Sequence, residues 1–114
     1  MHVKATDVAS HDGDARLKAE IIGKIDRMLD YLLKNVDLNT THLALTADHT
    51  TSCATRNHEG DPVPVAVFGP YVRRDSVREY SERACAEGGL NRISGADLMH
   101  ILMSYLGRTK KFGS

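Results

Sequence analysis

The sequence predicts an α/β fold, and three observations lead to this class. A strongly amphipathic helix lies between short apolar segments that are typical of strands, and two further helices follow near the C-terminus. The expected order is strand, helix, strand, strand, helix, helix, in which a helix that crosses between strands implies parallel pairing. Three strands make a thin sheet for so much apolar helix surface. We therefore expect one lobe of a larger sheet, or self-association through the truncated sheet.

The first expected strand is His2–Thr6, which enters a polar turn at Asp7. The turn at residues 12–14 is rich in short acidic side chains, which accept the free N–H groups at a helix start. The helix that follows has about six turns and ends between Asn35 and Asn39. Its apolar residues recur at three- and four-residue steps: Leu17, Ile21, Ile25, Met28, Leu32 and Val36, widened by Ile22, Leu29 and Leu33.

The second expected strand, Thr41–Ala47, is nearly continuous in apolar character, which suits a parallel strand covered on both faces. A polar loop over Asp48–Asp61 follows it. The third strand is Pro62–Phe68, whose two prolines favour an edge position. Gly69-Pro70 ends this strand.

Two helices complete the chain. Ser76 with Glu79 forms a capping box that predicts a short helix to about Ala86. Ser94 with Asp97 opens the last helix, with apolar residues Leu98, Ile101, Leu102, Tyr105 and Leu106, and Gly107 suits the left-handed position that stops it. The basic tail 108–114 is expected to fray.

Composition excludes several classes of function. The 15 Lys and Arg residues balance the 15 Asp and Glu residues, so no net charge attracts nucleic acid or an anionic membrane. No apolar run is long enough to span a bilayer, and the N-terminus lacks a signal-peptide pattern. The two cysteines, Cys53 and Cys85, are interpreted as free thiols of a cytosolic protein. We therefore expect a cytoplasmic protein.

Carboxylate and imidazole groups gather near the expected strand ends. Asp7 and His11 follow the first strand, Asp48 and His49 end the second, and His58 lies in the next loop. In open α/β sheets, functional side chains collect beyond the carboxyl ends of strands, so all five can reach one crevice. Mixed oxygen and imidazole ligands favour Mn, Zn or Co over Ca. The sequence therefore predicts a metal site.

The prediction depends on the combination of these residues. A lone Asp-x-x-x-His pair such as Asp7 and His11 is also consistent with two solvated side chains in a loop. Asp48 and His49 point in different directions if the backbone is extended, and they chelate one ion only at a kink. With a second ion nearby, such a pair can serve a two-metal centre for phosphoryl transfer.

Other polar residues have simpler interpretations. His2, His42 and His100 lack acidic partners and are expected at the surface or partly packed. Cys53 is either a soft ligand or a bystander thiol. Lys4 and Arg56 either contact a phosphate or are solvated. Asp12 and Asp14 are expected to cap the helix rather than bind metal.

The ordered motifs resemble those of the archaeal-type cofactor-independent (2,3-bisphosphoglycerate-independent) phosphoglycerate mutases of the alkaline phosphatase superfamily. The resemblance rests on residues 2–14, 45–53, 58–65, 88–93 and 111–113. It covers the whole chain, 1–114, which would be the C-terminal part of a metalloenzyme (phosphatase-like) domain. The implied fold is a three-layer parallel sheet with flanking helices, of which this chain forms a C-terminal lobe.

Family membership implies interconversion of 3-phosphoglycerate and 2-phosphoglycerate through a phosphoserine intermediate, as a step of glycolysis and gluconeogenesis. It also implies two divalent ions, manganese first, with Mg, Co or Zn as alternatives. Asp7, His11 and His58 would hold one ion, and Asp48 and His49 would belong to the other. Ser10 stands where relatives often carry Gly, a departure that bears on the turn between Asp7 and His11.

The resemblance also implies what this sequence lacks. The family's nucleophilic serine, a further metal-binding aspartate and the substrate-gripping domain match nothing here, so no catalytic or substrate-binding residue is assigned. We expect the chain alone to be inactive and its partner to be the missing N-terminal portion. Alternative interpretations are a non-catalytic metal-binding or interaction module, and a related metal-dependent phosphomonoesterase.

Overall fold

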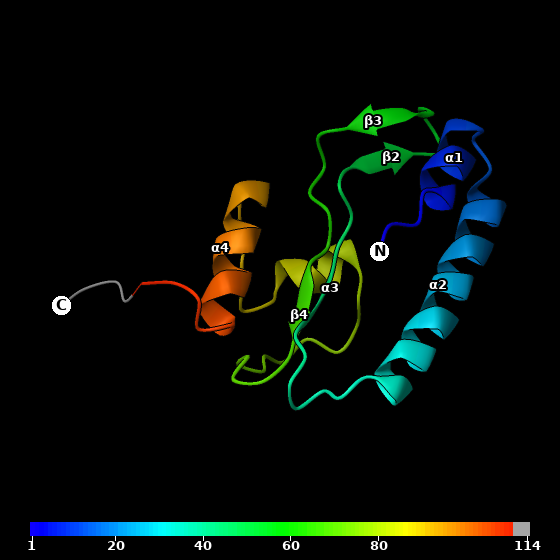
Figure 1. The fold of residues 1–114 in the computed structure, drawn as a ribbon. Helices are drawn as coiled ribbons and strands as arrows, with labels where there is room; N and C mark the ends of the chain where they lie inside the picture. The colour runs from blue at the N-terminus through cyan, green and yellow to red at the C-terminus, as the bar shows by residue number, and fades with distance from the viewer. Residues whose placement is uncertain (111–114) are drawn as a thin grey trace. The chain divides into compact units, whose positions relative to one another are not determined.

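A computed structural model describes residues 1–110 of the chain (Figure 1). Residues 111–114, with the last motif of the resemblance and the end of the predicted tail, lie outside the described part. The elements are α1 (Ala5–His11), α2 (Ala15–Asn35), β1 (Leu43–Leu45), β2 (Thr50–Ser52), β3 (Asn57–Glu59), β4 (Ala66–Phe68), α3 (Glu82–Ala86) and α4 (Gly95–Tyr105). They fall into two compact units. Unit 1 comprises Met1–Val36 and Ala47–Val63, and unit 2 comprises Asp37–Thr46 and the chain from Pro64 onward.

The mixed α/β class is confirmed, but the described strands pair antiparallel. β1 pairs with β4, and β2 pairs with β3. The predicted parallel pairing required a strand before α2, and the structure has a helix there. Without that strand, no helix crosses between neighbouring strands in residues 1–110. The third predicted strand, Pro62–Phe68, contains β4. The strand itself begins at Ala66, after the two prolines.

The predicted first strand, His2–Thr6, is wrong, because α1 begins at Ala5. This seven-residue helix has no side-chain cap, so local signals do not specify it. Its small residues Ala9 and Ser10 are 1% and 0% exposed, and α1 packs against both α2 and β2. Close packing of this small-residue face stabilises a helix that would be marginal alone.

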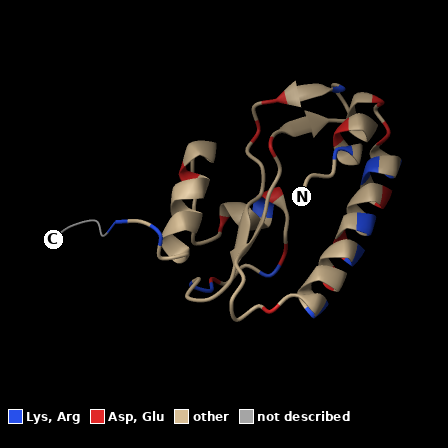
Figure 2. Cartoon of the chain, in the orientation of Figure 1, with Lys and Arg blue, Asp and Glu red and all other residues tan. Residues whose placement is uncertain are grey.

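The long helix α2 was predicted from its apolar period and is confirmed. Asp14 caps it by accepting a hydrogen bond from the backbone N–H of Leu17 at 2.8 Å. Its partly buried apolar residues follow the predicted stripe: Ile21, Ile25, Met28, Leu29 and Leu32, with Val36 at the C-cap. Lys18, which is not part of that stripe, is also partly buried. Leu17, Ile22 and Leu33 are more exposed. Positions with charges of both signs recur along the helix (Figure 2).

The segment predicted as a loop contains the hairpin β2–β3. Thr50 pairs with Glu59, Thr51 with His58 and Ser52 with Asn57. The turn closes with Arg56 at φ 56°, and the Arg56 N–H donates to the carbonyl of Ser52 at 2.8 Å. The residues of these short strands are polar, and only Thr50 and Thr51 are β-branched, so composition alone is typical of a loop.

In unit 2, β1 pairs with β4 and two helices follow. The predicted cap at Ser76 is wrong, because Ser81 caps α3, which begins at Glu82. α4 begins with the predicted capping box of Ser94 and Asp97. Gly107 follows it at φ 66°, as predicted.

Within residues 1–110, none of the helices combines the length and apolar character that a membrane span requires.

Candidate metal centre

Two of the predicted ligands project from one face of α1. Asp7 and His11 are four residues apart, a spacing that places side chains over each other on a helix. The Oδ1 atom of Asp7 lies 3.4 Å from Nε2 of His11. The sequence predicted Asp7 and His11 in a polar turn after a strand. In the structure both residues belong to α1, and the helix sets the distance between their side chains.

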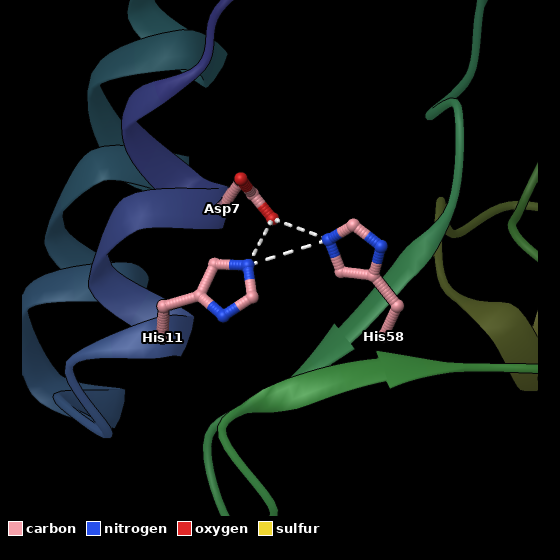
Figure 3. Close-up of side chains that lie close together, drawn as sticks. All are labelled: Asp7, His11 and His58. Atoms are coloured by element: carbon pink, nitrogen blue, oxygen red, sulfur yellow. Dashed lines mark hydrogen bonds and ion pairs between the residues drawn. The ribbon is translucent and has the colours of Figure 1, made fainter.

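The hairpin brings the third ligand to this face. His58 lies in β3, and its Nε2 atom is 3.6 Å from Oδ1 of Asp7 and 3.3 Å from Nε2 of His11 (Figure 3). All three donor atoms lie within 4.8 Å of one another. The side chains of His11 and His58 are 42% and 53% exposed, so one side of the cluster faces solvent.

A backbone carbonyl orients the His11 ring. Nδ1 of His11 lies 2.9 Å from the carbonyl oxygen of Arg56. Because a carbonyl only accepts, Nδ1 carries the proton, and in the neutral ring Nε2 presents its lone pair to Asp7 and His58. An outer hydrogen bond of this kind is typical of histidine ligands to metals.

The geometry of the three donor atoms fits a divalent ion. Ligand atoms at about 2.1 Å from an ion in a tetrahedral shell lie about 3.4 Å apart. The three observed separations, 3.3, 3.4 and 3.6 Å, agree with this value. Two imidazoles and one carboxylate suit Mn, Co or Zn, and three protein ligands leave coordination positions open, as in catalytic sites. In the ion-free cluster, Nε2 of His58 donates a hydrogen bond to Nε2 of His11. This proton must leave Nε2 of His58 before that atom can bind an ion.

Asp48 and His49 lie beside this cluster at a bend before β2. Oδ2 of Asp48 is 3.4 Å from Nε2 of His49, and the ring centroids of His49 and His58 are 3.9 Å apart. The kink that the sequence analysis required for joint chelation is therefore present. These two residues form a second group of potential ligands next to the first.

Hydrogen bonds favour the ionised form of both carboxylates, which is the form that binds metal ions. The pKa of Asp7 is lowered chiefly by the hydrogen bond from the Thr51 hydroxyl, which outweighs partial burial, and three nearby histidines lower it further. The pKa of Asp48 is also lowered, first by its own backbone N–H and then by His49, against partial burial.

The remaining candidates take structural positions. The carbonyl of Lys4 accepts from the N–H groups at the start of α1. A Cβ at Gly13 would lie 2.6 Å from Nε of Arg56, so the Arg56 side chain lies against this glycine. Cys53 is half-buried in the hairpin turn and outside the group of three ligands. The Ser10 hydroxyl donates to the carbonyl of Thr6, so serine is compatible with the helix between Asp7 and His11.

The three other histidines are at the surface or partly packed, as predicted. His2 and His100 are exposed, and His42 is half-buried in unit 2. Asp14 caps α2 as predicted, whereas Asp12 lies at the C-cap of α1.

Sequence reasoning missed Thr51 and Lys18. The Thr51 hydroxyl donates to Oδ1 of Asp7 at 2.7 Å, and Nζ of Lys18 donates to the Thr51 carbonyl at 2.8 Å. The only sequence signal for Thr51 is its place two residues after His49. Lys18 shows no signal, because it lies among the other charged residues of α2.

Comparisons with known proteins agree with this geometry. A profile described as the metalloenzyme superfamily matches residues 1–105. The chain is 46% identical over 114 residues to the 2,3-bisphosphoglycerate-independent phosphoglycerate mutase of Thermococcus kodakarensis, and 45% identical to that of Pyrococcus abyssi. Each alignment covers the whole chain and 28% of the relative. The chain thus spans under a third of the length of these curated relatives.

A solved structure of a protein from Pyrococcus horikoshii has the same fold over this region. It matches with a TM-score of 0.95 and 46% sequence identity, covering 99% of this chain and 34% of that one. The helix at the N-terminus and the antiparallel strand pairs are therefore features of a fold already seen in a longer protein.

Proposed function

The chain belongs to the metalloenzyme superfamily, and we propose that it supplies part of the two-metal centre of a 2,3-bisphosphoglycerate-independent phosphoglycerate mutase. The complete enzyme would interconvert 3-phosphoglycerate and 2-phosphoglycerate through a phosphoserine. The observation that carries the proposal is the convergence of Asp7, His11 and His58 within 4.8 Å, in a chain that is 46% identical to a mutase relative over 114 residues.

Asp7, His11 and His58 would hold one ion, and Asp48 with His49 would contribute to the other. Two bound divalent ions supply charge stabilisation for the attacking and leaving oxygens of a transferring phosphoryl group. The residues of this chain fix the positions of the donor atoms. Asp7 is oriented by Thr51, and His11 is oriented by the carbonyl of Arg56. Manganese is the first ion to test, because the resemblance implies it and mixed imidazole and carboxylate ligands suit it as they suit Co and Zn.

The remaining parts of the reaction would come from outside these 114 residues. The resemblance implies a nucleophilic serine, a further metal-binding aspartate and a substrate-gripping domain, none of which matches a segment of this chain. Covalent catalysis requires the nucleophile, so we expect residues 1–114 alone to show no mutase activity.

A chimeric enzyme tests this function. The chain replaces the matched segment of the Thermococcus kodakarensis relative, and phosphoglycerate interconversion is measured with added Mn²⁺. We expect the chimera to be active, and the same chimera carrying Asp7→Asn to be inactive although folded. The exposed His100→Ala substitution is the matched control. The unmodified relative serves as the reference for full activity.

Other outcomes would contradict the proposal in specific ways. Hydrolysis of phosphate monoesters without phosphoglycerate isomerisation would identify a related phosphomonoesterase. A folded, metal-binding but silent chimera would favour a non-catalytic module.

Self-association through apolar residues of unit 2 such as Phe68, which is 49% exposed, stays a prediction. A monomer in sedimentation would contradict it.

A further inference from the structure

Thr51 contacts both groups of potential metal ligands. It is the middle residue of β2, it is 5% exposed, and it lies directly opposite His58 in the hairpin. Its hydroxyl donates to Oδ1 of Asp7 at 2.7 Å and lies 3.1 Å from Nδ1 of His49. One buried oxygen atom therefore joins a ligand of the first group to a ligand of the second.

The direction of these hydrogen bonds follows from the chemistry of the groups. A hydroxyl has a single proton, and an ionised carboxylate only accepts, so the Thr51 proton points to Asp7. The hydroxyl oxygen must then accept from His49, which places the His49 proton on Nδ1. In the neutral ring, the lone pair of His49 is on Nε2, 3.4 Å from Oδ2 of Asp48.

The backbone of Thr51 is also held. Nζ of Lys18 donates to the Thr51 carbonyl at 2.8 Å, which connects β2 to α2. The hydroxyl connects the same residue to α1 through Asp7. Because Thr51 is held through both its carbonyl and its hydroxyl, the position of its hydroxyl is defined by two other elements, α1 and α2.

We propose that Thr51 is a positioning residue that couples the two metal positions, orienting Asp7 as acceptor and fixing His49 as the Nδ1–H tautomer with Nε2 free to bind. The inference rests on the proposed two-metal function for its consequence. The tautomer of His49 is a property of the ion-free chain and does not depend on that function. The tautomer and the two-metal function can therefore be tested separately.

The first experiment measures ¹⁵N chemical shifts of the histidine ring nitrogens in the ion-free 114-residue chain, at a pH well above the ordinary imidazole pKa of ~6.5. We expect wild-type His49 to carry its proton on Nδ1. Thr51→Val keeps the branched shape and removes the hydroxyl, so His49 should shift toward Nε2–H. Thr51→Ser should restore the wild-type pattern. Thr50→Val is the matched control, because the Thr50 hydroxyl donates to the carbonyl of Asp61 instead.

The second experiment titrates the same four proteins with Mn²⁺ by calorimetry. Loss of an outer partner of a metal ligand lowers affinity by about 10–100-fold, and we expect Thr51→Val to fall in this range. Thr51→Ser and Thr50→Val should bind as wild type does. Circular dichroism establishes that each variant is folded.

Two results would overturn the inference. One is a wild-type His49 that carries its proton on Nε2, which can be read even if Thr51→Val fails to fold. The other is a folded Thr51→Val variant with unchanged His49 shifts. If no protein binds Mn²⁺ while the tautomer changes as expected, the metal-binding consequence fails for the 114-residue chain and the positioning role of Thr51 stands.

Discussion

Nδ1 of His11 lies 2.9 Å from the carbonyl oxygen of Arg56, so the backbone of the hairpin turn determines which nitrogen of this ring faces Asp7 and His58. Arg56 has a positive φ of 56°, and this conformation lies at the end of the turn between β2 and β3. The turn thus contributes to the metal centre without supplying a ligand side chain.

Removal of one proposed ligand side chain should abolish tight metal binding. Removal of a hydrogen-bond partner of a metal ligand lowers affinity by about 10–100-fold. We expect His11→Ala and Asp7→Ala, which remove ligands themselves, to lower Mn²⁺ affinity by more than this. Calorimetric titration measures the effect, with His100→Ala as control because this histidine is exposed and belongs to α4. Equal affinities in all four proteins would contradict a metal centre at these residues.

The N-cap of α2 should contribute measurably to stability. Asp14→Ala removes the acceptor of the Leu17 N–H and should lower the free energy of unfolding by about 0.5–2 kcal/mol. Asp14→Ser retains a capping oxygen and should recover most of this loss. Urea unfolding followed by circular dichroism measures both variants. An alanine variant as stable as wild type would exclude a capping role.

Gly69 should not tolerate a side chain. Its φ is 154°, and a Cβ there would lie 2.5 Å from Cδ2 of His42 and 3.0 Å from the His42 Cα. We expect Gly69→Ala to destabilise the protein by about 1–3 kcal/mol. Gly60→Ala is the matched control, because nothing lies within 4 Å of its Cβ position, and it should change stability by less than about 0.5 kcal/mol. Similar melting temperatures for both variants would refute this difference.

Ionisation of Tyr80 should destabilise unit 2 in alkali. Burial raises the pKa of Tyr80 to about 12, with smaller contributions from Cys85 and Glu82, and its hydroxyl donates to the carbonyl of Pro64 at 3.1 Å. A raised folded-state pKa gives stability that is present below the unfolded value of 10.0 and is lost as the pH rises toward about 12.

Thermal unfolding as a function of pH tests this prediction. Tyr80→Phe should be less stable at neutral pH, because it lacks the hydrogen bond to Pro64, and should lose less stability above pH 10.0. Parallel pH profiles for the two proteins would show that ionisation of Tyr80 does not cause the loss of stability in alkali.

Strong local signals predicted two of the four described helices. α2 has an apolar stripe over its whole length and an aspartate cap, and α4 has a complete capping box and a terminal glycine. These features act within a few residues of sequence. In contrast, the capping-box spacing favoured Ser76, which has Glu79 three positions later, whereas Ser81 has Ala84 there. The structure nevertheless uses Ser81 as the cap of α3.

The elements that sequence reasoning missed depend on contacts distant in the chain. α1 is a seven-residue helix without a side-chain cap, stabilised by packing of Ala9 and Ser10. The hairpin has polar strands that resemble a loop. The converging side chains Asp7, His11 and His58 were nonetheless named from the sequence, because carboxylate and imidazole groups near one another indicate possible metal chemistry wherever the backbone places them. Their geometry, and the role of Thr51, required the structure.

His11 and His58 are 47 positions apart in the sequence, although their Nε2 atoms lie 3.3 Å apart. An ion bound to both would act as a reversible crosslink that closes a long loop. Because the two ligands come together only in the folded chain, the ion would bind only that form and add stability as its concentration rises. Both ligands belong to unit 1. A chelator that removes the ion should therefore lower the stability of unit 1 toward that of the ion-free chain.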